Sequence, residues 1–129
     1  MAARILVDSD ILIDAARGES QAVDFLDSKA NECSVCLSCI SHMELIVGCR
    51  NKRELAALDK FMQRFEVVQI DYVCSSTATD LLKTYRLSHG LLIPDALIAG
   101  AAMALGVEFF TKNRKHYRFI PGLHLGHYS

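Results

Sequence analysis

Short apolar runs alternate with segments of helical periodicity, and this alternation is the strongest constraint on what the chain can fold into. The apolar runs lie at residues 4–7, 33–40, 66–70 and 107–111. Strands that alternate with helices favour a parallel sheet, because parallel neighbours need crossover helices, which then cover both faces. We therefore expect an α/β fold, a three-layer α/β/α sandwich around a central parallel sheet of four to five strands with right-handed crossovers.

The segments between these runs carry helix start and stop signals. Residues 8–10 (Asp-Ser-Asp) offer N-cap chemistry for a helix that Gly18 would end, and Gly90 would stop a long helix further on. A Pro-Gly pair within residues 119–124 leaves at best a short edge strand there. The expected helices cover residues 11–16, 19–29, 53–65, 73–88 and 94–105, with a further helix that starts at Ser41.

Length and charge limit the classes of protein that remain. A chain of 129 residues is enough for one domain with one core, so we expect a single domain over residues 1–129. The net charge of −1 does not indicate a nucleic-acid partner, which must instead be argued from a site. No apolar run approaches the roughly 20 residues that span a bilayer, and the N-terminus lacks a signal-peptide core. We expect a cytoplasmic protein that does not enter a membrane.

Three of the five cysteines, Cys33, Cys36 and Cys39, form a C-x2-C-x2-C run that superficially suggests a zinc or iron–sulfur site. On a strand, Cys33 and Cys36 would point to opposite faces, and Cys33 and Cys39 would lie roughly 20 Å apart. Such a strand cannot gather the sulfurs around one metal, so we expect small buried hydrophobic residues. A cysteine-based metal or redox module stays open as an alternative.

Acidic and polar residues follow the expected strands. Asp8 and Asp10 follow the first strand, Glu44 lies just beyond the second, and Asn113 follows the fourth. Asp95 lies in the first turn of a helix that should begin at the same edge of the sheet. Because ligands bind at the carboxyl ends of parallel strands, these separate segments should converge on one carboxylate cluster.

Most of these acids also have a purely structural interpretation. Asp10 can be a helix N-cap, and Ser41 with Glu44 fits the capping box S-x-x-E. Asp95 suits the positive end of a helix dipole. Asp8 is harder to explain in this way, because a buried unpaired carboxylate would cost several kcal/mol. A bound cation would remove that cost.

Sequence blocks that contain these acids occur in a fixed order over nearly the whole chain. They are Ile-Leu-Val-Asp-Ser-Asp at 5–10, a Leu-Ser-x-Ile-Ser-x-x-Glu-Leu-x-x-Gly pattern at 37–48, Asp-Ala-Leu-Ile-Ala at 95–99, and Phe-Thr-Lys-Asn at 110–113 followed by Ile-Pro-Gly-Leu at 120–123. Together these blocks resemble the PIN-domain family, and within it the VapC-type toxins of toxin–antitoxin pairs.

The resemblance implies a metal-dependent endoribonuclease. Asp8, Glu44 and Asp95 correspond to the family's acidic triad, Ser9 to its hydroxyl beside the first Asp, and Asn113 to its variable fourth position. Carboxylate ligands without sulfur suit Mg²⁺ or Mn²⁺. The expected reaction is metal-assisted hydrolysis of RNA phosphodiester bonds, leaving 5′-phosphate and 3′-hydroxyl ends.

The chain departs from the family at the fourth position. Many members have Asp where this chain has Asn113, and those with Asn there often have Asp where this chain has His116. One acidic ligand is therefore missing, and this puts a second metal ion in question.

The partners follow from the same resemblance. We expect RNA to be held by basic side chains, whose alternative role is a solvated surface. The resemblance also implies an antitoxin protein and a homodimer. The candidate RNA-binding residues are Arg50, Lys52, Arg53, Lys60 and Arg64, together with Lys112, Arg114, Lys115 and Arg118.

Two other functions remain open from the sequence. An Asp-x-Asp pair after an apolar strand also suits a haloacid-dehalogenase-like phosphatase with Asp8 as nucleophile, although Ile11-Leu12 stands where Gly-Thr is expected. The second alternative is a catalytically silent PIN-like scaffold.

Overall fold

The core of the fold is a parallel sheet, as predicted. The computed structural model describes residues 3–128. All pairings between its strands are parallel, and the strand order is β3-β2-β1-β4. In the central register, Leu6 pairs with Cys36 on one side and with Phe109 on the other. The strands are β1 (Arg4–Val7), β2 (Ser34–Ser38), β3 (Glu66–Val68) and β4 (Glu108–Phe110).

The helices follow the predicted order, with boundaries shifted by up to three residues. Within residues 3–128, none of them is long and apolar enough to cross a membrane. Leu125 makes an isolated bridge to Phe109, just beyond the predicted edge segment 119–124. The helices are α1 (Ser9–Ala16), α2 (Ser20–Glu32), α3 (Cys39–Val47), α4 (Lys52–Met62), α5 (Tyr72–His89), α6 (Ile93–Leu105) and the short 3-10 helix η1 (Arg114–His116).

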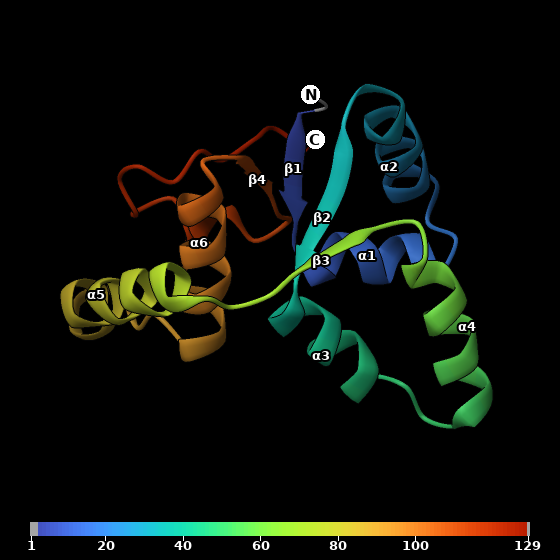
Figure 1. The fold of residues 1–129 in the computed structure, drawn as a ribbon, viewed down its shortest axis with the longest axis horizontal. Helices are drawn as coiled ribbons and strands as arrows, with labels where there is room; N and C mark the ends of the chain where they lie inside the picture. The colour runs from blue at the N-terminus through green and yellow to red at the C-terminus, as the bar shows by residue number, and fades with distance from the viewer. Residues whose placement is uncertain (1–2, 129) are drawn as a thin grey trace.

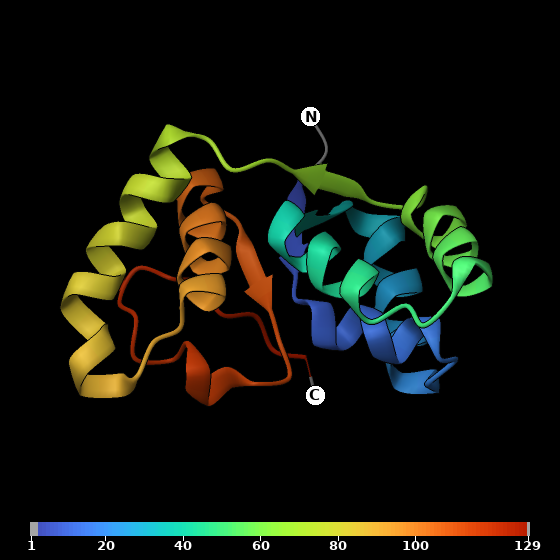
Figure 2. The ribbon, with the colours of Figure 1, turned by 90° about the horizontal axis from the view of Figure 1, so that it is seen from below.

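Helices cover both faces of the sheet, which confirms the three-layer sandwich. Successive residues of a strand point to opposite faces. Leu6 accordingly packs in a core with α5 and α6, whereas Ile5 and Val7 pack in a second core with α1, α2 and α4. Figures 1 and 2 show α5 and α6 on one side of the strands and these other helices on the opposite side.

Small residues let α5 and α6 approach closely. A Cβ atom on Gly100 of α6 would lie 2.6 Å from the carbonyl oxygen of Cys74 on α5, so only glycine fits there. Gly90 ends α5 with a left-handed φ of 69°, as its place in the sequence predicted. The close contact fixes the position of α6, whose first turn carries Asp95.

The cysteine run does not lie along one strand, so the prediction of a single strand over residues 33–40 was wrong. Only Cys36 is on β2, while Cys33 caps the end of α2 and Cys39 is the first residue of α3. The strand stops early because Ser38 caps α3, its Oγ accepting a hydrogen bond from the Ile40 amide at 3.0 Å. Cys36 and Cys39 are buried, as predicted, and Cys33 is half-buried.

Candidate active site

Asp8 lies where the strand order of the sheet reverses. It directly follows β1, whose two neighbours, β2 and β4, are reached by crossovers in opposite directions. Such a switch point opens a crevice at the carboxyl ends of the strands. The Asp8 amide donates to the carbonyl of Phe110 at the end of β4 (2.9 Å), and its side chain caps α1. Backbone pairing and capping therefore fix Asp8 at the mouth of this crevice.

The Asp8 carboxylate is buried and is held by uncharged donors. Oδ1 accepts from the Ser9 amide at 2.8 Å, and Oδ2 accepts from the Thr111 hydroxyl at 2.9 Å and lies 3.4 Å from the Tyr117 hydroxyl. Burial raises the pKa of Asp8 to about 7, and the negative charge of Asp10 adds to this, against the lowering effect of the Thr111 and Ser9 hydrogen bonds. Asp8 is thus an acid whose charged form the fold disfavours.

Asp10 turns its side chain toward the end of β4. Its Oδ1 accepts from the Ile11 amide at 2.7 Å, while Oδ2 accepts from the Lys112 amide at 3.0 Å and from Nδ2 of Asn113 at 3.3 Å. Burial raises its pKa. The N-cap of α1 is Asp8, so the interpretation of Asp10 as the cap was wrong. Asn113 does reach the carboxylate cluster, at the exposed edge beside Asp10.

Glu44 is brought to the cluster by α3. Its Oε1 accepts from the Ser9 hydroxyl at 3.1 Å. The predicted capping box with Ser41 was wrong, because α3 begins at Cys39 and Ser41 lies inside the helix. The pKa of Glu44 is raised by partial burial, against the Ser9 hydrogen bond, and further raised by the charges of Asp95 and Asp10. Ser9, which follows Asp8 in the chain and donates its amide to Asp8, therefore links Glu44 to Asp8.

Asp95 completes the cluster from the first turn of α6. Its Oδ1 accepts from the Tyr117 hydroxyl at 3.1 Å, and its Oδ2 lies 3.8 Å from Nδ1 of His116. The structure thus brings together all the residues predicted for the catalytic site, which are Asp8, Ser9, Glu44, Asp95 and Asn113.

Two buried hydroxyl groups in this site were not assigned from the sequence. Thr111 stands between Asp8 and Asp10, and Tyr117 stands between Asp8 and Asp95. The sequence could have indicated Thr111, because this residue ends the apolar run of the fourth strand. It could not have indicated Tyr117, because Tyr117 follows an irregular segment whose path has no sequence periodicity.

The donor set fits a hard divalent cation. The cluster offers carboxylate, hydroxyl and amide oxygens, which Mg²⁺ and Mn²⁺ prefer. Within residues 3–128, no three His, Cys, Asp or Glu side chains stand close enough to enclose one metal ion. Mg²⁺ usually keeps several waters and takes only one or two carboxylates directly, so it does not need such an enclosure.

Comparison with known proteins shows which family the chain belongs to. The PIN domain family matches residues 5–120, which is most of the chain. This chain belongs to the PIN-domain family. It is 34% identical over 120 residues to Ribonuclease VapC10 of Mycobacterium tuberculosis, a match that covers 92% of this chain and 90% of the relative. This PIN domain therefore stands among the VapC-type ribonucleases, and nucleases of that kind depend on a metal ion.

Solved structures of toxin–antitoxin complexes share the fold of this PIN domain. VapBC2 from Rickettsia felis, bound to a DNA fragment from its promoter, superposes with a TM-score of 0.83 at 26% identity, covering 95% of this chain and 97% of that chain. A toxin–antitoxin complex from Klebsiella pneumoniae gives a TM-score of 0.79 at 27% identity, covering 92% and 94%. Membership of the PIN family overturns the dehalogenase-like alternative with Asp8 as nucleophile.

Several basic residues of this PIN domain that were predicted to bind RNA already have partners within the chain. Arg50 pairs with Glu54 at 2.8 Å, Lys112 pairs with Asp14, and Arg114 donates to the Gly126 carbonyl at 2.6 Å. Of these, Lys112 is next to Asn113 and so lies at the rim of the acidic cluster. The other residues predicted to bind RNA have exposed side chains, and they are Lys52, Arg53, Lys60, Arg64, Lys115 and Arg118.

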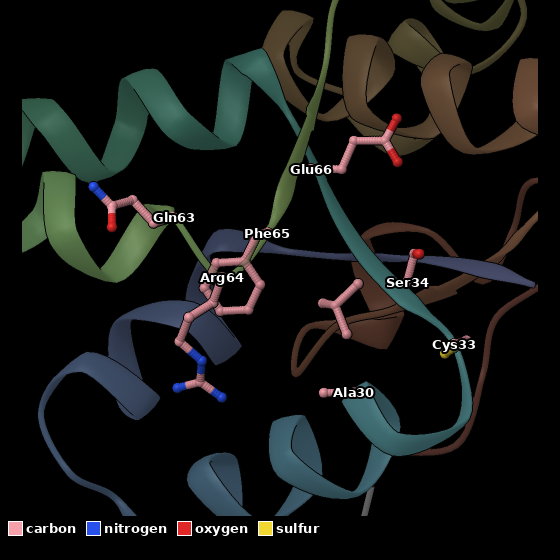
Figure 3. Close-up of a pocket in the computed structure, with 8 residues that line it drawn as sticks. Ala30, Cys33, Ser34, Gln63, Arg64, Phe65 and Glu66 are labelled. Atoms are coloured by element: carbon pink, nitrogen blue, oxygen red, sulfur yellow. The ribbon is translucent and has the colours of Figure 1, made fainter. Parts of the chain in front are cut away.

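A separate pocket of about 380 Å³ lies at the amino ends of β2 and β3, at the opposite end of the sheet from the Asp8 cluster. Figure 3 shows Arg64 and Phe65 on one side of it and Cys33 and Ser34 on the other. Its charged side chains are paired, because Arg64 contacts Asp27 at 2.9 Å and Glu66 contacts Arg4 at 3.1 Å. The pocket therefore lacks the uncompensated acids that mark the other end of the sheet.

Proposed function

We propose that this VapC-type ribonuclease cleaves RNA by hydrolysing phosphodiester bonds, with Mg²⁺ or Mn²⁺ held by Asp8, Glu44 and Asp95. One observation carries the proposal: the buried Asp8 carboxylate receives hydrogen bonds from uncharged groups, while the charges that raise its pKa are those of Asp10 and Asp95. A divalent cation is the partner that such a cluster lacks.

Each residue of the cluster has a distinct task in this proposal. Asp8 is held rigidly by the end of β1 and the start of α1, and supplies a fixed carboxylate. Glu44 and Asp95 approach from α3 and α6, and Ser9 orients Glu44 through its hydroxyl. Asn113 orients Asp10 through its amide.

The cation, when bound, would polarise the scissile phosphate and lower the pKa of the attacking water. The chain's own residues hold the negative charge that attracts it, and the rim supplies positive charge for the RNA backbone. Lys52, Arg53 and Lys115 are exposed side chains suited to that task, and Lys112 lies beside the cluster.

A cleavage assay tests the proposed function. A preparation of the protein that is shown to be free of any antitoxin should cleave single-stranded or loop RNA in a whole-cell RNA pool when Mg²⁺ or Mn²⁺ is present. A chelator or the variant Asp8→Ala should abolish this cleavage. Absence of cleavage by the wild-type chain under these conditions would favour the catalytically silent scaffold instead.

We also propose an antitoxin protein as the partner of this chain. The Klebsiella pneumoniae structure of similar fold is a toxin–antitoxin complex. In this chain, a cavity of about 570 Å³ lies between α1, α3 and α4, and its lining includes Glu44 together with apolar residues such as Leu45 and Phe61. A partner that filled this cavity with apolar side chains could place an Arg or Lys beside Glu44, where it would compete with the cation.

Growth measurements test the partner. Expression of the chain should arrest growth, and co-expression of the neighbouring gene should relieve the arrest. Equal growth of strains that express the wild type and Asp95→Ala at matched protein levels would contradict the toxin function. The homodimer, the cytoplasmic location and the single domain over residues 1–129 stay predictions, the first of which sedimentation analysis can test.

A further inference from the structure

The hydroxyl group of Tyr117 bridges two acids that come from distant parts of the chain. It lies 3.1 Å from Oδ1 of Asp95 and 3.4 Å from Oδ2 of Asp8. Asp8 follows β1 and Asp95 lies in the first turn of α6, so no local backbone geometry sets the distance between their carboxylates. The Tyr117 hydroxyl contacts both carboxylates.

Tyr117 is itself held firmly by the core. Its side chain is 1% exposed, and its ring meets the ring of Phe109 on β4 edge-on, with 4.9 Å between centroids. Its amide donates to the carbonyl of Arg114 across η1. A tyrosine hydroxyl is protonated at neutral pH and can donate a hydrogen bond. The bridging oxygen therefore has a fixed place relative to the sheet.

An uncharged bridge has a specific advantage at this point. A phenol hydroxyl has one proton and two acceptor positions, so it can donate to only one of the two carboxylates at a time. It relieves part of their mutual repulsion but adds no positive charge. An Arg or Lys in the same place would pair with the carboxylates and compete with a cation for them. Tyr117 thus orients both acids and leaves their full negative charge available.

We propose that Tyr117 is a positioning residue, which sets the spacing of Asp8 and Asp95 for a divalent cation without being a ligand. This inference rests on the proposed function, in which Asp8 and Asp95 hold that cation. Groups that orient metal ligands typically contribute 10- to 100-fold to metal affinity. The opposing possibility is that the hydroxyl only fills a polar site in the core and contributes to stability alone.

The variant Tyr117→Phe removes the hydroxyl and keeps the ring that packs on Phe109. Mn²⁺ binding to the full chain, measured by calorimetry without RNA, should weaken by about tenfold or more. RNA cleavage should need a correspondingly higher Mn²⁺ concentration, with a smaller loss of kcat at saturating Mn²⁺. The matched control is Tyr85→Phe, which removes a phenol hydroxyl from a ring on α5 that packs against Phe119, and it should change neither quantity.

A second measurement separates positioning from stability. If the hydroxyl only stabilises the core, Tyr117→Phe lowers the melting temperature equally with and without Mn²⁺. If it positions the acids, the rise in melting temperature caused by Mn²⁺ becomes smaller in Tyr117→Phe than in wild type.

The variant Asp95→Asn distinguishes failure of this inference from failure of the proposed function. Unchanged Mn²⁺ affinity in Tyr117→Phe, together with lost affinity in Asp95→Asn, would overturn the positioning role alone. Unchanged affinity in both variants would overturn the positioning role and the proposed function together.

Discussion

The two ends of the parallel sheet treat acidic side chains in opposite ways. At the amino ends of the strands, Glu66 pairs with Arg4 and, beside them, Asp27 pairs with Arg64, with all these side chains partly in solvent. At the carboxyl ends, Asp8 is buried and receives hydrogen bonds from hydroxyl and amide groups that carry no charge. An acid paired with arginine on the surface has its charge already balanced, whereas the charge of Asp8 remains to be balanced by a ligand.

The buried acid at the carboxyl end lowers the free energy of unfolding when it ionises, whereas the paired acids at the amino end do not. The pKa of Asp8 is raised to about 7, so ionising it at neutral pH works against the folded state. Exposed ion pairs such as Arg4 with Glu66 contribute between about 0 and 1 kcal/mol.

Neutralising Asp8 should remove most of the activity. Asp8→Asn keeps the size and the capping oxygen of the side chain but not its charge, so RNA cleavage should fall by roughly 10³-fold, equivalent to about 4 kcal/mol of lost transition-state stabilisation. The matched control at the other end of the sheet is Glu66→Gln, which makes the same acid-to-amide change and should cleave RNA at the wild-type rate. Equal losses in both variants would contradict the contrast.

The same acid should make the metal-free protein less stable as the pH rises. The folded-state pKa of Asp8, about 7, lies above the ordinary aspartate pKa of 3.8 that applies to the unfolded chain. The folded state therefore binds the proton more tightly, and its stabilisation is complete below the unfolded pKa and is lost as the pH rises through about 7. In chelator, the free energy of unfolding should decrease between about pH 4 and pH 8, by an amount that approaches about 4 kcal/mol.

Asp8→Asn should flatten this dependence and make the metal-free protein more stable than wild type at pH 8. Denaturant unfolding in chelator across this pH range measures both effects. If wild type and Asp8→Asn follow parallel curves, Asp8 is not the group that titrates.

Adding a charge at the fourth position should sharpen the contrast. Asn113 donates to Asp10 at 3.3 Å, so Asn113→Asp places a new carboxylate at the edge of the cluster. At about 4 Å and an effective dielectric constant of about 20, a unit charge interacts with another by about 4 kcal/mol before desolvation. Even a quarter of this corresponds to several-fold tighter Mn²⁺ binding by calorimetry and a lower Mn²⁺ requirement for cleavage. Unchanged values would mean that Asn113 orients Asp10 without facing the cation.

Breaking the ion pair at the amino end should have the smallest effect. The side chains of Arg4 and Glu66 are 39% and 50% exposed, so Glu66→Gln should change the free energy of unfolding by less than about 1 kcal/mol. Mn²⁺ affinity should also stay at the wild-type value. A loss of Mn²⁺ binding in Glu66→Gln would place the cation at the amino ends of the strands and would contradict a site at Asp8.

The sequence was informative where periodicity and chain order act locally. The strand runs and the Gly90 stop signal predicted the parallel sheet and the end of α5. The acids beyond the strands, together with Asp95 at the start of a helix, predicted that Asp8, Glu44 and Asp95 converge. Local rules failed at Ser41, because the strand ends early and Ser38 caps α3 instead. Tyr117 could not be found from the sequence, because its role depends on contacts with Asp95, 22 positions away, and with Asp8, 109 positions away.

The most direct test of the central claim is to locate the cation itself. Crystals of the full chain soaked in Mn²⁺ should give an anomalous difference peak at the carboxyl ends of the strands, in contact with Asp8 and between the side chains of Glu44 and Asp95. The same experiment on Asp8→Asn should lose the peak. A peak at the amino-end pocket near Asp27 and Glu66, or no peak beside Asp8 at saturating Mn²⁺, would contradict the account.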